Sequence, residues 1–221
     1  MMKKNYNNIL LRVIPLFLML ICICSCKQDK TMQMKQEETP NTKIENKNNE
    51  VKIYLYGNFP MDVAEKLKVS LAPIFGKVAI CGILEEPKSA YCTEIKRFAT
   101  SFLNDVGKYR DKNELLLCLT TTDISLAEYK GRKNWGVMGL SYLGKGVSVI
   151  SPYRLHGIQK LNIDNFYKLA LHELGHAAGL PHCNNSHDCF MRDACGKNHF
   201  PELTCFCPSC KEFLINKGWN L

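Results

Sequence analysis

The run HELGHAAGLPHC, at residues 172–183, constrains this chain more than any other feature of its sequence. On a helix, residues i and i+4 project from one face, so the imidazoles of His172 and His176 can converge on one metal ion. Gly179 can adopt the left-handed backbone that ends a helix, and the proline after it prevents the helix from resuming, so His182 arrives from a turned segment. The spacing therefore predicts three imidazole ligands and one open position.

Imidazole ligands indicate zinc rather than magnesium or calcium, although iron, nickel and cobalt also accept them. A catalytic zinc keeps one of its four positions for water. Glu173 lies three positions before His176, near enough to reach a metal-bound water without itself binding the metal. Two ordinary helix-surface histidines are the alternative explanation, but the added Gly179 and His182 make a chance match rare.

Half of the 12 cysteines fall in the last 39 residues, which indicates disulfides or a metal. Cys183 and Cys189 precede a CxxC pair, Cys207 and Cys210, and four thiolates make a closed structural zinc site. Adjacent residues of an extended backbone point in opposite directions, so His182 and Cys183 can serve two different ions. Disulfides remain the alternative, because an exported chain meets an oxidising compartment.

Residues 1–25 are typical of an export signal, with two lysines followed by an apolar segment at residues 13–23. That segment has about half of the ~20 residues that a membrane-spanning helix needs. The run ICSC at residues 23–26 resembles a bacterial lipobox, which implies cleavage before Cys26 and lipid attachment to it. We expect an exported protein anchored to a bacterial membrane, the outer one where the host has two, since Lys27 is not an aspartate retention signal. A plain signal peptide or an uncleaved anchor is the alternative.

Residues 26–50 are rich in Lys, Gln, Glu, Asn and Thr and cannot bury enough apolar surface to fold, so Cys26 is predicted to begin a flexible tether. Residues 51–221 then form one domain, which their length and the 46% hydrophobic content of the chain allow. The net charge of +8 includes three cations in the first 25 residues, and no basic stripe follows. We therefore expect no nucleic-acid partner.

Hydrophobic periodicity predicts an alternation of strands and helices in residues 51–221. Strands are predicted at residues 51–56, 77–84, 114–122, 135–140 and 146–151, and helices from Asp62 to about Pro73, over 89–109 and over 166–179. This order favours an α+β fold with a mixed sheet and helices on one side of it, rather than a doubly wound fold. The Cys-rich segment follows the last helix.

Three motifs together resemble the archaemetzincins, a family of metzincin zinc peptidases. They are the run HELGHAAGLPHC, the element CFM at residues 189–191 and the terminal CPSC at residues 207–210. Upstream, the runs LLLCLTTTD, WGV at residues 135–137 and SPYRL extend the resemblance over about residues 89–210. The spacing of the cysteines departs from the usual spacing of the family, so other cysteines, Cys195 and Cys205, remain candidate ligands.

The resemblance implies a metzincin-like α+β fold with an active-site helix, backing helices and a zinc-binding C-terminal segment. It implies two zinc ions per chain, one catalytic and one structural. The implied roles are His172, His176 and His182 as ligands of the catalytic zinc, Glu173 as general base, Met191 as the methionine of the turn beneath the metal, and Cys183, Cys189, Cys207 and Cys210 as ligands of the structural zinc.

The implied reaction is hydrolysis of a peptide or protein substrate, in which zinc activates its bound water and Glu173 takes the water's proton. A peptide would lie extended along residues 135–140, with Trp135, Gly136 and Val137 as the substrate edge strand. A covered core strand is the alternative for this segment. The competing functions are a non-catalytic, membrane-tethered zinc-binding or interaction module, against which the intact Glu173 argues, and a CxxC redox protein, which would need a preceding βαβ pattern.

Overall fold

The structure is a computed structural model that describes residues 50–221, so the predicted signal peptide, Cys26 and nearly all of the predicted tether lie outside it. The strands are β1 (Glu50–Tyr56), β2 (Val78–Leu84), β3 (Lys96–Phe98), β4 (Glu114–Leu119), β5 (Asp123–Tyr129), β6 (Arg132–Val137), β7 (Gly139–Tyr142) and β8 (Val147–Ile150). The helices are α1 (Met61–Phe75), α2 (Ala99–Val106), α3 (Ile163–Ala177) and α4 (Pro208–Asn216). Within residues 50–221, none of these helices combines the length and apolar character needed to span a bilayer.

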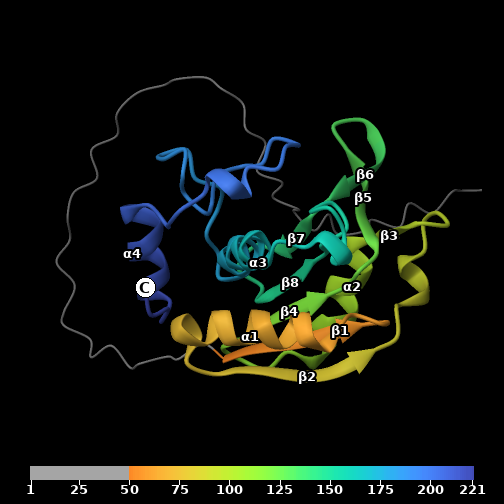
Figure 1. Cartoon of the computed structure of the whole chain (residues 1–221), viewed down its shortest axis with the longest axis horizontal. Coiled ribbons are helices and arrows are strands. Elements are labelled where there is room, and N and C mark those ends of the chain that lie inside the picture. The colour runs from red at the N-terminus through yellow and green to blue at the C-terminus, as the bar shows by residue number, and fades with distance from the viewer. Residues whose placement is uncertain (1–49) are drawn as a thin grey trace, which may run out of the picture. The chain divides into compact units, whose positions relative to one another are not determined.

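Five strands form the main sheet in the order β2-β1-β4-β8-β7, and three form a smaller sheet in the order β3-β5-β6. In the main sheet β2, β1, β4 and β8 are parallel, whereas β7 runs antiparallel to β8 and forms one edge. The hairpin of β5 and β6 extends beyond the main sheet (Figure 1). This arrangement confirms the predicted α+β class with a mixed sheet.

Helices cover both faces of the main sheet. On β4, the side chains of Leu115, Leu117 and Leu119 belong to a core shared with α1 and α3, whereas Leu116 and Cys118 belong to a second core shared with α2. Burial on both faces explains why this strand is a near-continuous apolar run. The expectation that helices lie on one side of the sheet is wrong, because α2 brings an apolar face of its own to the other side.

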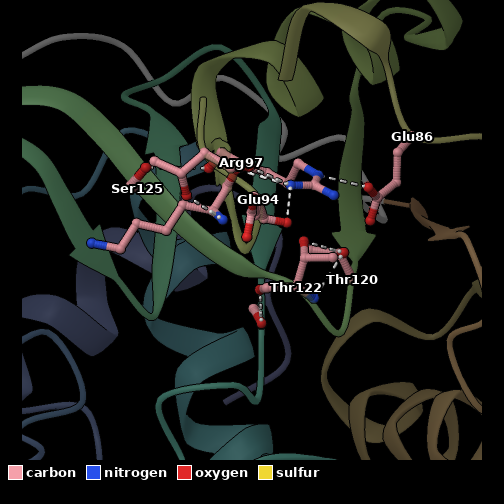
Figure 2. Close-up of polar contacts among 9 residues, drawn as sticks. Glu86, Glu94, Arg97, Thr120, Thr122 and Ser125 are labelled. Carbon is pink, nitrogen blue, oxygen red and sulfur yellow. Dashed lines mark hydrogen bonds and ion pairs between the residues drawn. The ribbon is translucent and has the colours of Figure 1, made fainter. Parts of the chain in front are cut away.

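The helix predicted over residues 89–109 is much shorter in the structure, where only α2 is helical and β3 precedes it. The guanidinium of Arg97 donates to Glu86 Oε2 at 2.9 Å and to the carbonyl oxygen of Thr93 at 3.1 Å, as Figure 2 shows for Glu86. These bonds hold the chain before α2 in a tight turn and a short strand. Ile95 matches the helical spacing but lies in this turn, where it is 62% exposed.

Two of the predicted strands are also corrected. The strand predicted at residues 114–122 ends early, and β5, which the sequence did not indicate, follows it. The strand predicted at residues 135–140 is two strands in different sheets, because β6 ends before Met138 and β7 begins after it. The carbonyl oxygen of Met138 accepts a hydrogen bond from the backbone N–H of Ser151 at 2.9 Å, where the chain passes from the small sheet to the main one.

The helix predicted at residues 166–179 begins earlier because Asn162 caps it. Its side-chain oxygen accepts hydrogen bonds from the backbone N–H groups of Asp164 and Asn165, at 2.9 and 3.3 Å. The sequence did not indicate α4, which lies in the Cys-rich segment. This helix begins with Pro208, whose fixed backbone angle suits the first helical position.

The second core should respond to truncation of Phe102, which is fully buried on α2 and contacts the ring of Tyr56 at 4.9 Å between centroids. Phe102→Ala is expected to lower the free energy of unfolding by about 3–5 kcal/mol, measured by urea denaturation. Ile95→Ala is the matched control and should change it by only about 0.5 kcal/mol, because that side chain is exposed. Equal losses in the two variants would contradict the placement of α2.

Candidate active site and metal centres

Helix α3 brings two imidazoles together with their Nε2 atoms facing each other. His172 Nε2 and His176 Nε2 are 3.1 Å apart. The Nδ1 atom of His172 lies 2.7 Å from the carbonyl oxygen of Phe190, and Nδ1 of His176 lies 2.7 Å from that of Leu180. A carbonyl oxygen only accepts, so each Nδ1 carries the proton and each Nε2 keeps its lone pair for a metal.

The third imidazole comes from the turn after α3, as predicted. Gly179 has a φ of 105°, in the region that favours glycine, and its N–H donates to the carbonyl oxygen of His176 at 2.9 Å. The ring of His182 then lies 4.6 Å from that of His176, between centroids. The ligand atoms of the three histidines all lie within 4.8 Å of one another. The carboxylate of Asp193 lies 3.9 Å from Nδ1 of His182.

Burial keeps these histidines in the neutral form that binds a metal. Desolvation lowers the pKa of His172 to about 4 and holds the pKa of His176 well below its usual value. Burial also lowers the pKa of His182, although the negative charge of Asp193 opposes this shift. Three neutral imidazoles with converging nitrogens fit a zinc ion with one position left for another ligand.

Met191 packs directly against α3 at Gly175, which lies between His172 and His176 in the sequence. It is fully buried, and its backbone carbonyl accepts a hydrogen bond from the N–H of Cys183 at 2.8 Å. Gly175 makes this approach possible, because a Cβ atom at that position would lie 2.6 Å from Met191 Sδ. The methionine therefore packs directly on α3 at Gly175, the residue before His176.

Glu173 is 5% exposed and lies on the side of α3 that faces β7. Its Oε2 accepts a hydrogen bond from Ser141 Oγ at 2.6 Å. Burial raises the pKa of Glu173 to about 7, and the hydrogen bond from Ser141 opposes that rise. A carboxyl group with this pKa is suited to take up and release a proton near neutral pH.

The four cysteines of the predicted structural site form one buried cluster, with their sulfur atoms within 4.8 Å of one another. Cys183 Sγ and Cys207 Sγ are 3.5 Å apart, far longer than a disulfide bond of about 2.05 Å. Zinc bonds of about 2.3 Å in a tetrahedron put sulfur atoms about 3.8 Å apart, so the spacing fits zinc. The other candidate ligands, Cys195 and Cys205, are exposed and lie outside the cluster.

The pKa of Cys207 in this cluster is lowered from its usual value. Burial opposes ionisation, but hydrogen bonds from the hydroxyl of Ser209 and from the backbone of Cys210 outweigh burial and lower its pKa. It directly precedes α4, whose N-terminus favours negative charge. Because a thiolate is the form of cysteine that binds zinc, the donor set fits the metal.

The predicted edge-strand residues lie on β6, at one edge of the small sheet. The ring of Trp135 packs against Tyr129 at 5.7 Å between centroids. Gly136 admits the guanidinium of Arg154, which would overlap any Cβ atom there and which forms two hydrogen bonds, at 2.8 and 2.9 Å, with the buried carboxylate of Asp123. Val137 ends β6, and α3 packs instead against strands of the main sheet, among them β7 at its edge.

Sequence reasoning missed the contacts that β7 makes with the site. Gly139 and Ser141 are two residues apart, so both face Glu173, and no motif marks either of them. A sequence prediction that ended one strand before Met138 and began the next after it would have put Gly139 and Ser141 on one face of the second strand. Asp193, beside His182, was also missed, although its position two residues after Met191 puts it near the metal centre.

Comparisons with known proteins agree with this geometry. The model of "Peptidase family M54" matches residues 137–216. The archaemetzincin of Nanoarchaeum equitans is 32% identical over 137 residues, which cover 62% of this chain and 73% of that protein. The archaemetzincin of Natronomonas pharaonis is 30% identical over 148 residues, covering 62% of this chain and 82% of that protein.

Solved structures show the same fold. The archaemetzincin of Methanopyrus kandleri superposes with a TM-score of 0.62 at 21% identity, over 77% of this chain and 96% of that chain. The archaemetzincin of Archaeoglobus fulgidus superposes with a TM-score of 0.58 at 27% identity, over 73% of this chain and 99% of that chain. The family resemblance drawn from the sequence motifs is thereby confirmed. This chain is a zinc metallopeptidase of the archaemetzincin family.

Proposed function

We propose that this chain hydrolyses peptide bonds at the three-histidine centre with Glu173 as general base. One observation carries the proposal: Glu173 is buried on α3 directly after His172, whose Nε2 atom faces that of His176 at 3.1 Å. Among residues 50–221 no cation pairs with Glu173, and burying a carboxylate without one costs free energy. A metal held by the neighbouring histidines would supply the missing positive charge.

Bound zinc would supply Lewis-acid chemistry, polarising the scissile carbonyl and acidifying water. His172, His176 and His182 would hold it, the first two through Nε2, because their Nδ1 atoms are hydrogen-bonded to backbone carbonyls. Glu173 takes the proton of the attacking water and returns it to the leaving amine.

The substrate is a peptide or protein bound in an extended form along the open edge of β7. This strand pairs with β8 on one side and is the last strand of the main sheet as described for residues 50–221. An added peptide strand would satisfy its free backbone groups with main-chain hydrogen bonds. Trp135, Gly136 and Val137, on β6 at the edge of the small sheet, would contact the more distant part of the peptide.

A second zinc, held by Cys183, Cys189, Cys207 and Cys210, would have a structural role. All four thiols are buried, and the chain on either side of them contains few regular elements besides α4. A closed four-thiolate site leaves no position for water, so it serves folding rather than catalysis. The proposed content is therefore two zinc ions per chain.

We also propose that the mature protein is a lipoprotein anchored through Cys26 to a bacterial membrane, the outer one where two are present. This part rests on the sequence of residues 1–26, which lie outside the described residues. The tether that follows would let the domain act on peptides beyond the membrane surface.

The role of Glu173 is tested by comparing a base variant with a ligand variant. Glu173→Ala is expected to keep both zinc ions while peptide cleavage falls by about 10²–10⁴-fold, because it removes a proton acceptor and no metal ligand. His172→Ala should lose activity together with one zinc, measured by metal analysis of the same samples.

The assay uses zinc-loaded protein and a broad peptide library, with the new termini mapped by mass spectrometry. Wild-type cleavage rates in Glu173→Ala would contradict the assigned base. If zinc-loaded wild type cleaves no peptide in the library, the chain is better described as a non-catalytic, membrane-tethered zinc-binding module.

The metal content is tested under reducing conditions by elemental analysis and thiol titration. The wild type is expected to hold two zinc ions, because the two ligand sets are separate. Cys207→Ser combined with Cys210→Ser should remove one ion and lower the stability of the fold, whereas His176→Ala should remove the other ion with less effect on stability. One zinc per chain with all four clustered cysteines oxidised would refute the structural zinc.

The anchor is tested by membrane fractionation and by the intact mass of the purified protein. Wild type should partition with membranes and carry the added mass of a lipid, whereas Cys26→Ser should do neither. Cys22→Ser is the matched control and should be lipidated as in wild type. A wild-type protein of unmodified mass in the soluble fraction would rule out the anchor.

A further inference from the structure

The carboxylate of Glu173 is held against β7 by two neighbouring positions on one face of that strand. Ser141 Oγ donates to Oε2 at 2.6 Å, a hydrogen bond to a charged group and so stronger than one between neutral groups. Gly139 leaves the space that Oε1 occupies, because a Cβ atom there would lie 2.5 Å from this oxygen. The strand therefore fixes both oxygens of the carboxylate, one by a bond and one by shape.

Two serine hydroxyls share the other hydrogen bonds at this point, and Ser141 Oγ itself also lies 2.8 Å from the backbone carbonyl oxygen of Glu173. Ser148 lies opposite Ser141 in the β7–β8 ladder, and their Oγ atoms are 3.0 Å apart. Ser148 Oγ also lies 3.1 Å from the backbone carbonyl oxygen of Glu173. Each hydroxyl has one proton, so Ser148 can donate to that carbonyl while Ser141 donates to the carboxylate.

These two hydroxyls interrupt a surface that is otherwise apolar. The face of the main sheet beneath α3 carries side chains such as Leu117, Leu119 and Ile150, and Ser148 is fully buried among them. A buried hydroxyl costs free energy unless it is bonded, and an alkyl side chain would pack at least as well here. The serine pair joins α3 to the sheet through the backbone carbonyl of Glu173, and Ser141 in addition bonds its carboxylate.

We propose that Ser141 is a positioning residue for the reaction, an inference that rests on the proposed role of Glu173 as base. Its hydroxyl donates a hydrogen bond to Oε2 of Glu173, so Oε1 is the oxygen that remains to receive the proton of the attacking water. Oε1 lies over Gly139, at the open edge of the sheet where the peptide is proposed to bind. Without this hydrogen bond the carboxylate of Glu173 can rotate about χ3, a torsion with a broad energy minimum. Oε1 would then no longer be held in one orientation.

The test measures kcat and KM separately for the zinc-loaded full chain. Ser141→Ala is expected to lower kcat about 10- to 100-fold, the usual effect of losing one hydrogen bond to a charged group, with KM, zinc content and the urea midpoint close to wild type. Ser125→Ala is the matched control: it removes another buried strand hydroxyl, on β5 (labelled in Figure 2), and should leave kcat and KM unchanged.

A second variant, Gly139→Ala, places a methyl group against Oε1 and is expected to lower kcat with the zinc content unchanged. A wild-type kcat for Gly139→Ala would overturn the placement of Oε1 over β7. It also tests the proposal if Ser141→Ala does not fold.

Glu173→Ala in the same assay separates this inference from the function on which it rests. If Glu173→Ala is as active as wild type, the proposed function fails. If Glu173→Ala is inactive and Ser141→Ala keeps the wild-type kcat, only the role of Ser141 is overturned. In the Glu173→Ala background, Ser141→Ala should not lower the residual kcat further, because Ser141 acts through that carboxylate. An equal fall in both backgrounds, or a fall accompanied by zinc loss, shows a structural role and overturns the proposal.

Discussion

Two hydrogen bonds from the imidazoles of α3 to backbone carbonyls organise the active side of this molecule. The Nδ1 atoms of His172 and His176 each lie 2.7 Å from a carbonyl oxygen in the segment that follows the helix, at Phe190 and Leu180. These bonds select the tautomer that leaves Nε2 available, orient both rings, and attach the irregular C-terminal segment to the helix. These two hydrogen bonds thus determine which ring nitrogen can bind a metal, how the rings are oriented, and where the chain after α3 lies.

Sequence predicted those parts of the fold that depend on local periodicity. The strands at 51–56, 77–84 and 146–151 and the helix from Asp62 agree with the structure to within a few residues. The helix over 89–109 failed because Arg97 forms an ion pair with Glu86, a contact between segments whose pairing no periodicity reports. The short α2 that remains covers the second face of the sheet, a placement that the order of elements along the chain does not reveal.

Within the site, the sequence predicted the histidines, whose spacing along the chain is diagnostic. It missed the residues of β7 that contact Glu173. His172 and His176 are one helical turn apart and His182 follows a glycine turn, so all three could be found from the chain alone. Ser141 and Gly139 belong to a strand that reaches Glu173 only through the tertiary packing of α3 on the sheet. A serine and a glycine two residues apart form no recognisable sequence motif. Their relation to Glu173 becomes visible only when the face of β7 that packs against α3 is known.

The turn after α3 places His182 and Cys183 next to each other, although their side chains belong to two different ligand sets. Consecutive Cα atoms across a trans peptide bond are fixed about 3.8 Å apart, so the position of Cys183 limits where the Cα atom of His182 can lie. The sulfur of Cys183 is confined by three other thiols, and its backbone N–H is bonded to Met191. The most exposed of the three imidazoles therefore inherits its precision from a neighbouring cluster of sulfur atoms rather than from the helix that carries the other two.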